Sequence, residues 1–242
     1  MDEVLRYFQK GFNYSQDGPG NRLVYHLSGC NLHCPWCSNP EGLAPGGGRE
    51  ETVSRILRAV ASARPMFFDG GGLTLTGGEA TLQFKAVMQL LEKVRDLGIH
   101  TCIETNATHP RLPELFPLLD LLIADYKIPD KEALFSWTGA DISVVEENIR
   151  KAAAFGIPLA LRTPLIRGVN DDEDDLAGFV RFFGEVKGPG VTVEFLRYHE
   201  YGRDKWEKMG MRYAMADAFV GTERVLQFER ACREAGIDVV RT

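Results

Sequence analysis

The sequence predicts an α/β fold in which parallel strands alternate with outer helices. Short β-branched apolar runs recur along the chain, segments with helical periodicity lie between them, and no repeat or low-complexity linker interrupts the alternation. With 242 residues, the chain is long enough for one large domain or two small ones. We expect one domain over residues 1–242, with its core at about 20–200 and a C-terminal helix and short strand at about 211–242.

Six apolar runs are the expected strands: residues 23–29, 73–78, 99–106, 121–127, 159–166 and 191–200. Helical periodicity marks residues 52–63, 81–98, 142–156 and 172–186, followed by a final helix at 222–235 and a possible short strand in "IDVVR". The segment 81–98 carries one apolar stripe, at Phe84, Val87, Leu90, Leu91, Val94 and Leu97. Gly98 and Gly156 stand where helix-ending glycines are expected. Residues 44–50 have the composition of a flexible loop.

Composition and charge exclude several classes of protein. The net charge of −6 argues against a nucleic-acid backbone as the main partner. No run approaches 18 apolar residues, so we expect no membrane span, and the charged start "MDEVLRYFQKGF" lacks the apolar core of an export signal. We therefore expect a cytoplasmic protein whose thiols stay reduced.

Polar side chains follow the expected strands at the points where those strands end. They are Cys30, Gly77-Gly78-Glu79, Glu104-Thr105-Asn106, Asp125 and Lys127, Arg162 within its strand, and His199-Glu200. Ligands of parallel βα folds bind at the carboxyl ends of the strands. The joint placement of these residues therefore predicts one shared site.

The stretch "GCNLHCPWCSNPEG" holds three of the five cysteines, Cys30, Cys34 and Cys37, in the pattern C-x3-C-x2-C. Such thiols in a reducing compartment bind metal or do redox work. Zinc would need a fourth ligand such as His26 or His33, but His33 lies inside the spacer between two cysteines. Three thiolates on a four-iron cluster leave one iron open, as a catalytic site requires, so we favour an iron–sulfur site over zinc.

The sequence then resembles a known family. The cysteine pattern and "TLTGGEATLQ" resemble the radical S-adenosylmethionine enzymes. "DGPGNRLVYHLSGC", "IHTCIETN", "ADYK", "LRTPLIRGVNDDEDDL" and "YHEYGRDKWEKMG" look like the activating enzymes of glycyl radical enzymes, of the pyruvate formate-lyase activating type. The resemblance covers residue 17 to about 210 in family order. It implies a partial (β/α)6, TIM-like barrel.

The resemblance also implies cofactors and site residues. Cys30, Cys34 and Cys37 match the catalytic ligands of a 4Fe–4S cluster whose open iron binds S-adenosylmethionine. The positions that match further contacts to this cofactor are Trp36, Ser38, Gly77, Gly78, Glu79, Glu104, Asp125, Tyr126, Lys127 and His199. Glu104 and Asp125 match a monovalent-cation site for Na⁺ or K⁺. Asp17, Asn39 and Arg162 match contacts to the target polypeptide.

The activity that the resemblance implies is an oxidoreductase reaction on a protein. A 5′-deoxyadenosyl radical made from S-adenosylmethionine takes a hydrogen atom from a backbone glycine of a partner glycyl radical enzyme. Flavodoxin or ferredoxin is the expected electron donor. These anaerobic activases need neither a nucleic acid nor a membrane.

Two features depart from the family pattern. Glu104 stands where aspartate is common, which puts the cation site in doubt. "CSNPEG" resembles activases of dehydratases and decarboxylases, but the ferredoxin-like insertion that usually follows there is replaced by "LAPGGGRE". We therefore expect one cluster and do not assign the partner.

Other interpretations stay open from the sequence. Asp17 belongs to a turn-like Asp-Gly-Pro-Gly, Glu79 is a plausible helix-start acid, and Cys102 and Cys232 read as structural thiols. The run "DDEDD" at 171–175 reads as a helix start that the macrodipole favours. The alternative functions are a radical enzyme that modifies a peptide or small molecule directly, and a non-enzymatic metal-binding module.

Overall fold

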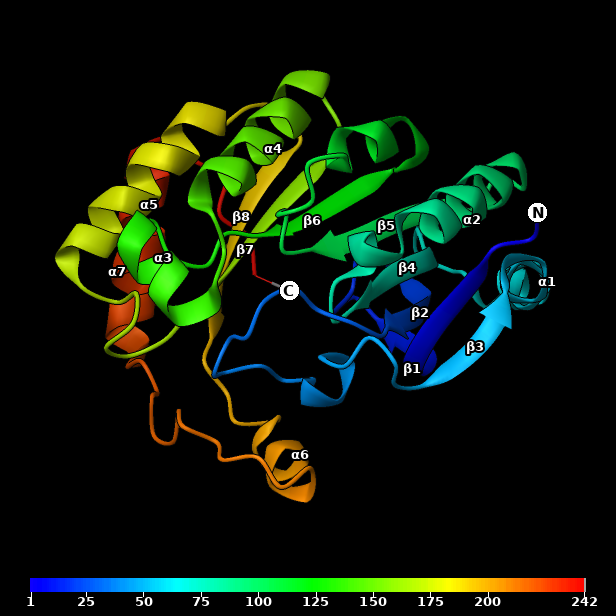
Figure 1. The fold of residues 1–242 in the computed structure, drawn as a ribbon. Helices are drawn as coiled ribbons and strands as arrows, with labels where there is room; N and C mark the ends of the chain where they lie inside the picture. Colours follow the sequence, from blue (N-terminus) through cyan, green and yellow to red (C-terminus); the bar gives the residue numbers. More distant parts are fainter. Residues whose placement is uncertain (242) are drawn as a thin grey trace. The chain divides into compact units, whose positions relative to one another are not determined.

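The computed structural model describes residues 1–241 and contains a mostly parallel sheet covered by helices (Figure 1). Its eight strands follow the order β3-β1-β2-β4-β5-β6-β7-β8, and the sheet is not closed. The strands are β1 (Val4–Tyr14), β2 (Asn21–Leu27), β3 (Arg49–Thr52), β4 (Gly72–Gly77), β5 (His100–Thr105), β6 (Leu121–Asp125), β7 (Leu159–Leu165) and β8 (Val191–Arg197). The α/β class and the six expected strands are confirmed.

Seven α-helices lie between or after the strands. They are α1 (Val53–Ala63), α2 (Phe84–Asp96), α3 (Lys131–Thr138), α4 (Ile142–Phe155), α5 (Glu173–Val186), α6 (Arg203–Lys208) and α7 (Thr222–Glu234). Short 3₁₀ helices are η1 (Pro40–Gly42), η2 (Arg64–Met66), η3 (Ala80–Gln83) and η4 (Leu112–Leu118). No helix among residues 1–241 is long and apolar enough to cross a bilayer.

Two strands at the start of the chain were not expected from the sequence. β1 pairs antiparallel with β2 and β3, with a register irregularity between Tyr7 and Gln9. Residues 9–12 of β1 are all exposed, so this half of the strand shows no alternation of apolar and polar side chains. β3 is only "REET", and its Arg49 and Glu50 pair with β1, which makes the expectation of a loop over 44–50 wrong at its end.

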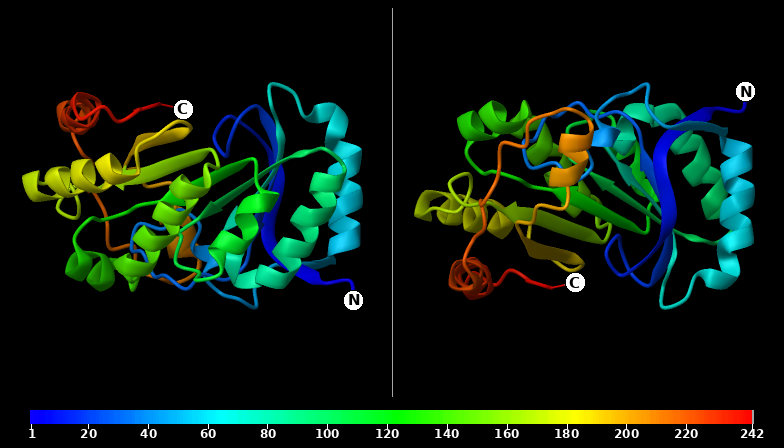
Figure 2. Two further views of the ribbon diagram at one scale, coloured as in Figure 1. Left: turned by 90° about the horizontal axis from the view of Figure 1, so that it is seen from above. Right: turned by 90° about the horizontal axis from the view of Figure 1, so that it is seen from below.

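The chain forms two compact units, which are described separately. The first unit comprises Met1–Asn31, Asn39–Thr105 and His109–Ile123. Its helices α1 and α2 lie side by side in both views of Figure 2. The expected stripe of α2 is confirmed from Phe84 to Val94, whose apolar members are buried, while Leu97 is only half-buried at the helix end. Burial of this stripe fixes the position of α2 after the Gly77-Gly78-Glu79 turn.

The second unit comprises Leu32–Ser38, Asn106–Thr108 and the chain from Ala124 onward. Aromatic side chains from α5, β8, α7 and the residue after β6 form its core: Tyr126, Phe179, Phe182, Phe183, Phe195 and Phe228. α5 and α7 therefore lie side by side (Figure 2). Val239 forms an isolated parallel bridge to Val193, which is what remains of the expected last strand.

The helix ends follow the signals in the sequence. Asp172 caps α5 in a reciprocal capping box with Asp175, so the acidic run is a helix start as expected. Gly156 ends α4 in the left-handed conformation that glycine adopts without strain. α3 and α6 were not expected, because both are short and carry only weak apolar periodicity.

A buried carboxylate on α7 predicts a pH-dependent contribution to stability. Glu229 is 1% exposed and accepts hydrogen bonds from Arg241 (Nε, 2.8 Å) and Arg233 (Nη1, 3.2 Å). The Arg241 guanidinium first, then Arg233, lowers the pKa of Glu229 below its usual value, despite the opposing effect of burial. Because the folded pKa lies below the unfolded pKa of about 4.3, this stabilisation is present above that pH and is lost as the pH falls. We expect Glu229→Gln to lower the free energy of unfolding by about 1–3 kcal/mol at pH 7.

Denaturant unfolding of the parent, Glu229→Gln and the exposed Glu223→Gln on the same helix checks this. The difference between parent and Glu229→Gln is expected to shrink as the pH falls below about 4. Equal stability of parent and Glu229→Gln at pH 7 would contradict the prediction.

Candidate active site: the cysteine loop and the strand ends

The cysteine loop (residues 29–42) leaves the sheet after β2. At its start, in the first unit, Gly29 N–H donates to Gly42 O (2.8 Å) and Cys30 N–H to Leu43 O (3.3 Å). In the second unit, Cys37 N–H donates to Cys34 O (3.1 Å), which closes a turn between these two cysteines. These bonds fix the backbone at Cys30 within the first unit and at Cys34 and Cys37 within the second.

None of the five cysteines forms a disulfide, but their surroundings differ. Cys30, Cys34 and Cys37 are half-buried, whereas Cys102 and Cys232 are fully buried, as expected for structural thiols. Burial raises the pKa of the Cys232 thiol to about 12, so this thiol stays protonated and unreactive near neutral pH. The loop therefore holds the thiols that are accessible for ligation. Its His33 ring lies against Gly139, where an added Cβ would come 2.7 Å from the imidazole.

The Gly77-Gly78-Glu79 turn follows β4 and lies against the start of the cysteine loop. A Cβ at Gly77 would lie 2.2 Å from Leu27 N, and one at Gly78 would lie 2.2 Å from Gly29 O. Glu79 N–H donates to Gly29 O (2.7 Å). Real Cβ atoms do not approach backbone this closely, so both glycines are required for this turn to pack on the loop.

Glu79 is almost completely buried, at 1% exposure, and its carboxylate is held by three donors. Oε1 accepts from Thr81 N–H (2.9 Å), Thr81 Oγ1 (2.5 Å) and Thr105 Oγ1 (2.7 Å). Glu79 also caps η3, so the interpretation as a helix-start acid holds as well. A buried carboxylate in a fixed orientation suits recognition of an ammonium group.

Glu104 stands near the carboxyl end of β5 in the same unit. Its carboxylate accepts a hydrogen bond from Thr76 Oγ1 on β4 (3.0 Å). Asn39 lies at the start of η1, where its carbonyl accepts from Gly42 N–H (2.9 Å). Asp17 lies before β2 while Cys30 follows it, so β2 separates these two residues, and Asp17 O accepts from Thr74 Oγ1 (2.7 Å).

The second unit carries the predicted residues of β6 to β8. Asp125 and Lys127 form an ion pair of 2.6 Å at the end of β6. Between them, Tyr126 belongs to the aromatic core, and its hydroxyl donates to Glu146 (2.9 Å), so its side chain is engaged there. Burial first, and then Glu146, raises the pKa of Tyr126. The Tyr126 side chain therefore lies in the aromatic core, whereas its two neighbours pair with each other.

Arg162 on β7 forms a buried ion pair with Glu194 on β8. Arg162 Nε donates to Glu194 Oε2 (3.1 Å), and both side chains are less than a tenth exposed. Buried charges of this kind need their partners, because an unpaired charge loses its hydration without compensation. Glu194 was not singled out in the sequence, although it is an acid in an otherwise apolar strand, and such an acid signals a buried partner.

His199 and Trp36 complete the predicted set in this unit. His199 follows β8, stacks on Tyr201 with ring centroids 4.0 Å apart, and has a pKa lowered by burial, so it is neutral near pH 7. Trp36 is 8% exposed and its ring centroid lies 6.2 Å from that of Trp137. The packing of Trp36 leaves the loop with an ordered aromatic face. Ser38 is half-buried beside Cys37.

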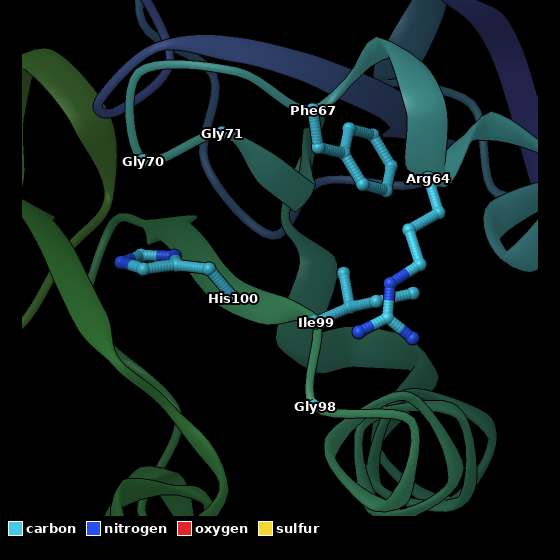
Figure 3. A pocket seen from close by; sticks show the side chains of 7 residues that line it. All are labelled: Arg64, Phe67, Gly70, Gly71, Gly98, Ile99 and His100. Atoms are coloured by element: carbon cyan, nitrogen blue, oxygen red, sulfur yellow. The ribbon is translucent and has the colours of Figure 1, made fainter.

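The opposite, amino end of β4 and β5 has a different character. Figure 3 shows a cavity of about 280 Å³ there, lined by Arg64, Phe67, Gly70, Gly71, Gly98, Ile99 and His100. Beside it, Arg22 is fully buried and donates to Thr74 Oγ1 (2.6 Å) and Leu73 O (2.7 Å), and burial lowers its pKa. Buried polar bonds stabilise this end of the first unit. It is separated from Glu79 by the length of β4.

Comparison with known proteins identifies the class. The family model described as "Radical SAM superfamily" matches residues 24–180. The chain is 33% identical over 207 residues to pyruvate formate-lyase 1-activating enzyme of Escherichia coli (strain K12), with 82% of each chain covered. It is 31% identical over 211 residues to pyruvate formate-lyase-activating enzyme of Staphylococcus aureus (strain USA300), covering 83% of this chain and 84% of the relative.

Solved structures agree on the fold. A domain of pyruvate-formate lyase-activating enzyme from Bacteroides vulgatus superposes with a TM-score of 0.58 at 24% identity, covering 70% of this chain and 98% of that one. Streptococcus suis SuiB bound to precursor peptide SuiA gives 0.66 at 17% identity, with 89% and 47% covered. The chain belongs to the radical SAM superfamily. Within that superfamily, it belongs to the family of the pyruvate formate-lyase activating enzymes.

Family membership implies a 4Fe–4S cluster and S-adenosylmethionine, and the cysteine loop fits them. It offers three half-buried thiols outside any disulfide, which are the soft ligands that such a cluster takes, and three ligands leave one iron for the cofactor. Among residues 1–241, no three His, Cys, Asp or Glu side chains form a ready-made metal site, so this assignment rests on donor chemistry and on the family. The residues predicted at the strand ends keep their places on or after their strands, whereas Asp17 precedes β2. The meeting of all six strand ends at one site stays a prediction.

The thiols predict a first outcome. Cys30→Ala, Cys34→Ala and Cys37→Ala are each expected to abolish stable cluster assembly, since each removes one of three ligands. Cys102→Ala is the matched control, because that thiol is fully buried in the first unit. Iron and sulfide content with the visible absorption spectrum after anaerobic reconstitution measures this. A full cluster in any of the three loop variants would exclude that cysteine as a ligand.

Thr105 predicts a second outcome. Thr105→Val keeps the shape of the side chain but removes the hydroxyl on β5 that donates to Glu79. We expect the free energy of unfolding to fall by about 1 kcal/mol. The affinity for S-adenosylmethionine should fall as well, since Glu79 loses its fixed orientation. Denaturant unfolding and equilibrium binding, with Thr101→Val as a second buried threonine of β5, separate the two effects. Unchanged affinity in Thr105→Val would show that this bond does not position Glu79 for binding.

Proposed function

We propose that this protein activates a glycyl radical enzyme by reductive cleavage of S-adenosylmethionine. The observation that carries the proposal is similarity over four fifths of both chains to enzymes named for activation of pyruvate formate-lyase. The three-cysteine loop supports it, because thiolates are the ligands that an iron–sulfur cluster takes. The glycyl radical enzyme is therefore the protein substrate.

The chemistry that the cluster supplies when bound is a one-electron reduction of S-adenosylmethionine, giving methionine and a 5′-deoxyadenosyl radical that takes one hydrogen atom from a backbone glycine of the partner. The protein's part is to bind, orient and exclude water. We assign the three loop cysteines to the cluster and the buried Glu79 carboxylate to the methionine ammonium group. The backbone of Gly77 and Gly78 sets the position of Glu79 against the loop.

The remaining residues are assigned by their place on the strands. Lys127, held by Asp125, carries the positive charge for the methionine carboxylate. The neutral His199 ring and Trp36 are assigned to the ribose and the adenine. Glu104 and Asp125 are the candidates for a monovalent cation. Ser38 and the backbone of Tyr126 complete the proposed cofactor contacts.

Contacts to the partner polypeptide are assigned to Asp17, Asn39 and Arg162. Arg162 is held by Glu194 in a buried pair, which fixes the direction of its guanidinium: Nε–H bonds to Glu194, and the Nη groups are donors of the kind that backbone carbonyls accept. We propose that a flavodoxin or ferredoxin supplies the electron. We also place the protein in the cytoplasm, where the loop thiols stay reduced, and treat residues 1–242 as a single radical SAM domain without a second cluster.

The test is anaerobic. The protein is reconstituted with iron and sulfide, reduced, and supplied with S-adenosylmethionine and a candidate glycyl radical enzyme. We expect 5′-deoxyadenosine and a glycyl radical signal in electron paramagnetic resonance to appear together. Both should be absent in Cys34→Ala and present in Cys102→Ala.

Two results would oppose the proposal. 5′-Deoxyadenosine that forms without a radical on any glycyl radical enzyme, but with modification of a peptide or small molecule, would move this chain to a directly modifying radical enzyme. No cleavage from a fully assembled cluster, with or without partner proteins, would favour a binding or electron-transfer module.

A further inference from the structure

A segment after β8 packs on the cysteine loop within the second unit. We call residues 198–215 the strap; it contains α6, which lies beyond the end of β8 in Figure 1. Trp206 Nε1–H of the strap donates to the carbonyl oxygen of Cys37 (2.9 Å), across 169 positions of sequence. The indole has only one N–H, and its bond goes to the backbone of a cluster ligand.

A second, independent contact joins the same two segments. Gly202 is buried at the start of α6, and a Cβ there would lie 2.3 Å from Cys37 O and 3.0 Å from Ser38 Cα. Its φ of −78° is ordinary for any residue, so glycine is needed at this position for closeness and not for its backbone conformation. The strap and the loop therefore meet with no room for a side chain between them.

Hydrogen bonds within the strap hold its own shape, so Trp206 contacts the loop from a fixed position. Tyr198 is buried and shares a hydroxyl hydrogen bond with Tyr213, and its hydroxyl also donates to Met215 O. Met211 N–H donates to Trp206 O (2.9 Å), and the Tyr213 ring lies 6.2 Å from Trp206. The pKa of Tyr213 is raised, chiefly by burial, and Cys37 adds to the rise. Trp206 and Gly202 contact the Cys37 backbone, and the Tyr213 ring packs beside Trp206.

We propose that Trp206 is a positioning residue that holds Cys37 in place for cluster ligation, and that the strap limits the access of water to this ligand. The proposal rests on the assigned function of the cysteine loop. Partners that bond to a ligand residue fix its orientation, and hydrogen bonding and solvent exposure tune an iron–sulfur centre. Loss of the indole N–H therefore frees the Cys37 backbone and opens that side of the loop to solvent.

The test begins with reduced, cluster-free protein, so its readout does not depend on catalysis. Alkylation rates of the individual thiols are measured by peptide mass spectrometry in the parent, Trp206→Phe, Gly202→Ala and Lys208→Ala. Trp206→Phe removes the N–H and keeps a ring, Gly202→Ala forces the strap off Cys37, and Lys208→Ala changes an exposed side chain of the same helix.

We expect Cys37 to react about fivefold faster in Trp206→Phe, which corresponds to a bond worth about 1 kcal/mol. Gly202→Ala should accelerate Cys37 as well, and Lys208→Ala should match the parent. Cys232 should stay slow in all four proteins, because it reports opening of the core. In reconstituted protein, the midpoint potential of the cluster should become more positive in Trp206→Phe, which is followed by electron paramagnetic resonance.

Unchanged Cys37 reactivity in both Trp206→Phe and Gly202→Ala would overturn the proposal. So would parallel acceleration of Cys37 and Cys232, because that pattern shows general unfolding. A parent protein that fails to cleave S-adenosylmethionine but shows the expected Cys37 rates would refute the assigned function and leave the positioning role standing.

Discussion

The close approach of two backbone segments is the constraint on which the first half of the site depends. Gly77 and Gly78 bring the turn after β4 within van der Waals range of Leu27 and Gly29, at distances that exclude any side chain. Once this contact is made, Glu79 N–H bonds to Gly29 O and the first cysteine is fixed relative to the turn. The two glycines therefore allow two chain segments to pack closely together.

Burial of charge is organised in the same way in both units. Glu79 is surrounded by threonine donors, Arg162 is paired with Glu194, and Arg22 bonds to Thr74 and backbone carbonyls. Each of these groups would be costly in the interior without its partners. The partners also fix the direction of each charge, which is what orientation of a charged ligand requires. Glu229 is a buried charge of the same kind outside the candidate site. Its arginine partners lie near the C-terminal end of the chain, and we assign this pairing to stability alone.

Local patterns in the sequence predicted the elements that have strong periodicity or clear end signals. α2 and α5 follow from an apolar stripe and an acidic start, and the six parallel strands follow from apolar runs. β1 and β3 were missed because residues 9–12 of β1 are exposed, β3 is short and polar, and the pairing of both depends on a partner strand elsewhere in the chain. The cysteine pattern and the glycine pair were recognisable because they are contiguous.

The residues that hold the site residues in place were not predictable in this way. Trp206 acts through a partner 169 positions away, so no local spacing marks its contact. Thr105 and Glu194 each stand out locally, as a polar residue at a strand end and as an acid within β8, but their partners lie 26 and 32 positions away and no spacing identifies them. Arg22 left one local signal, a cation inside the apolar strand "NRLVYHL". Tyr126 stands between two predicted site residues, and its ring packs among phenylalanines of the core. Its predicted contact with the cofactor stays a prediction.

The bond between Trp206 and Cys37 also bears on the order in which the protein is made. The cysteine loop leaves the ribosome long before the strap does, because 169 residues separate the two bonded groups. Domains fold in the order of synthesis at about 5–20 residues per second. For roughly ten seconds or more, a growing chain thus carries Cys37 without the segment that packs on it. The arrival of the strap ends that interval.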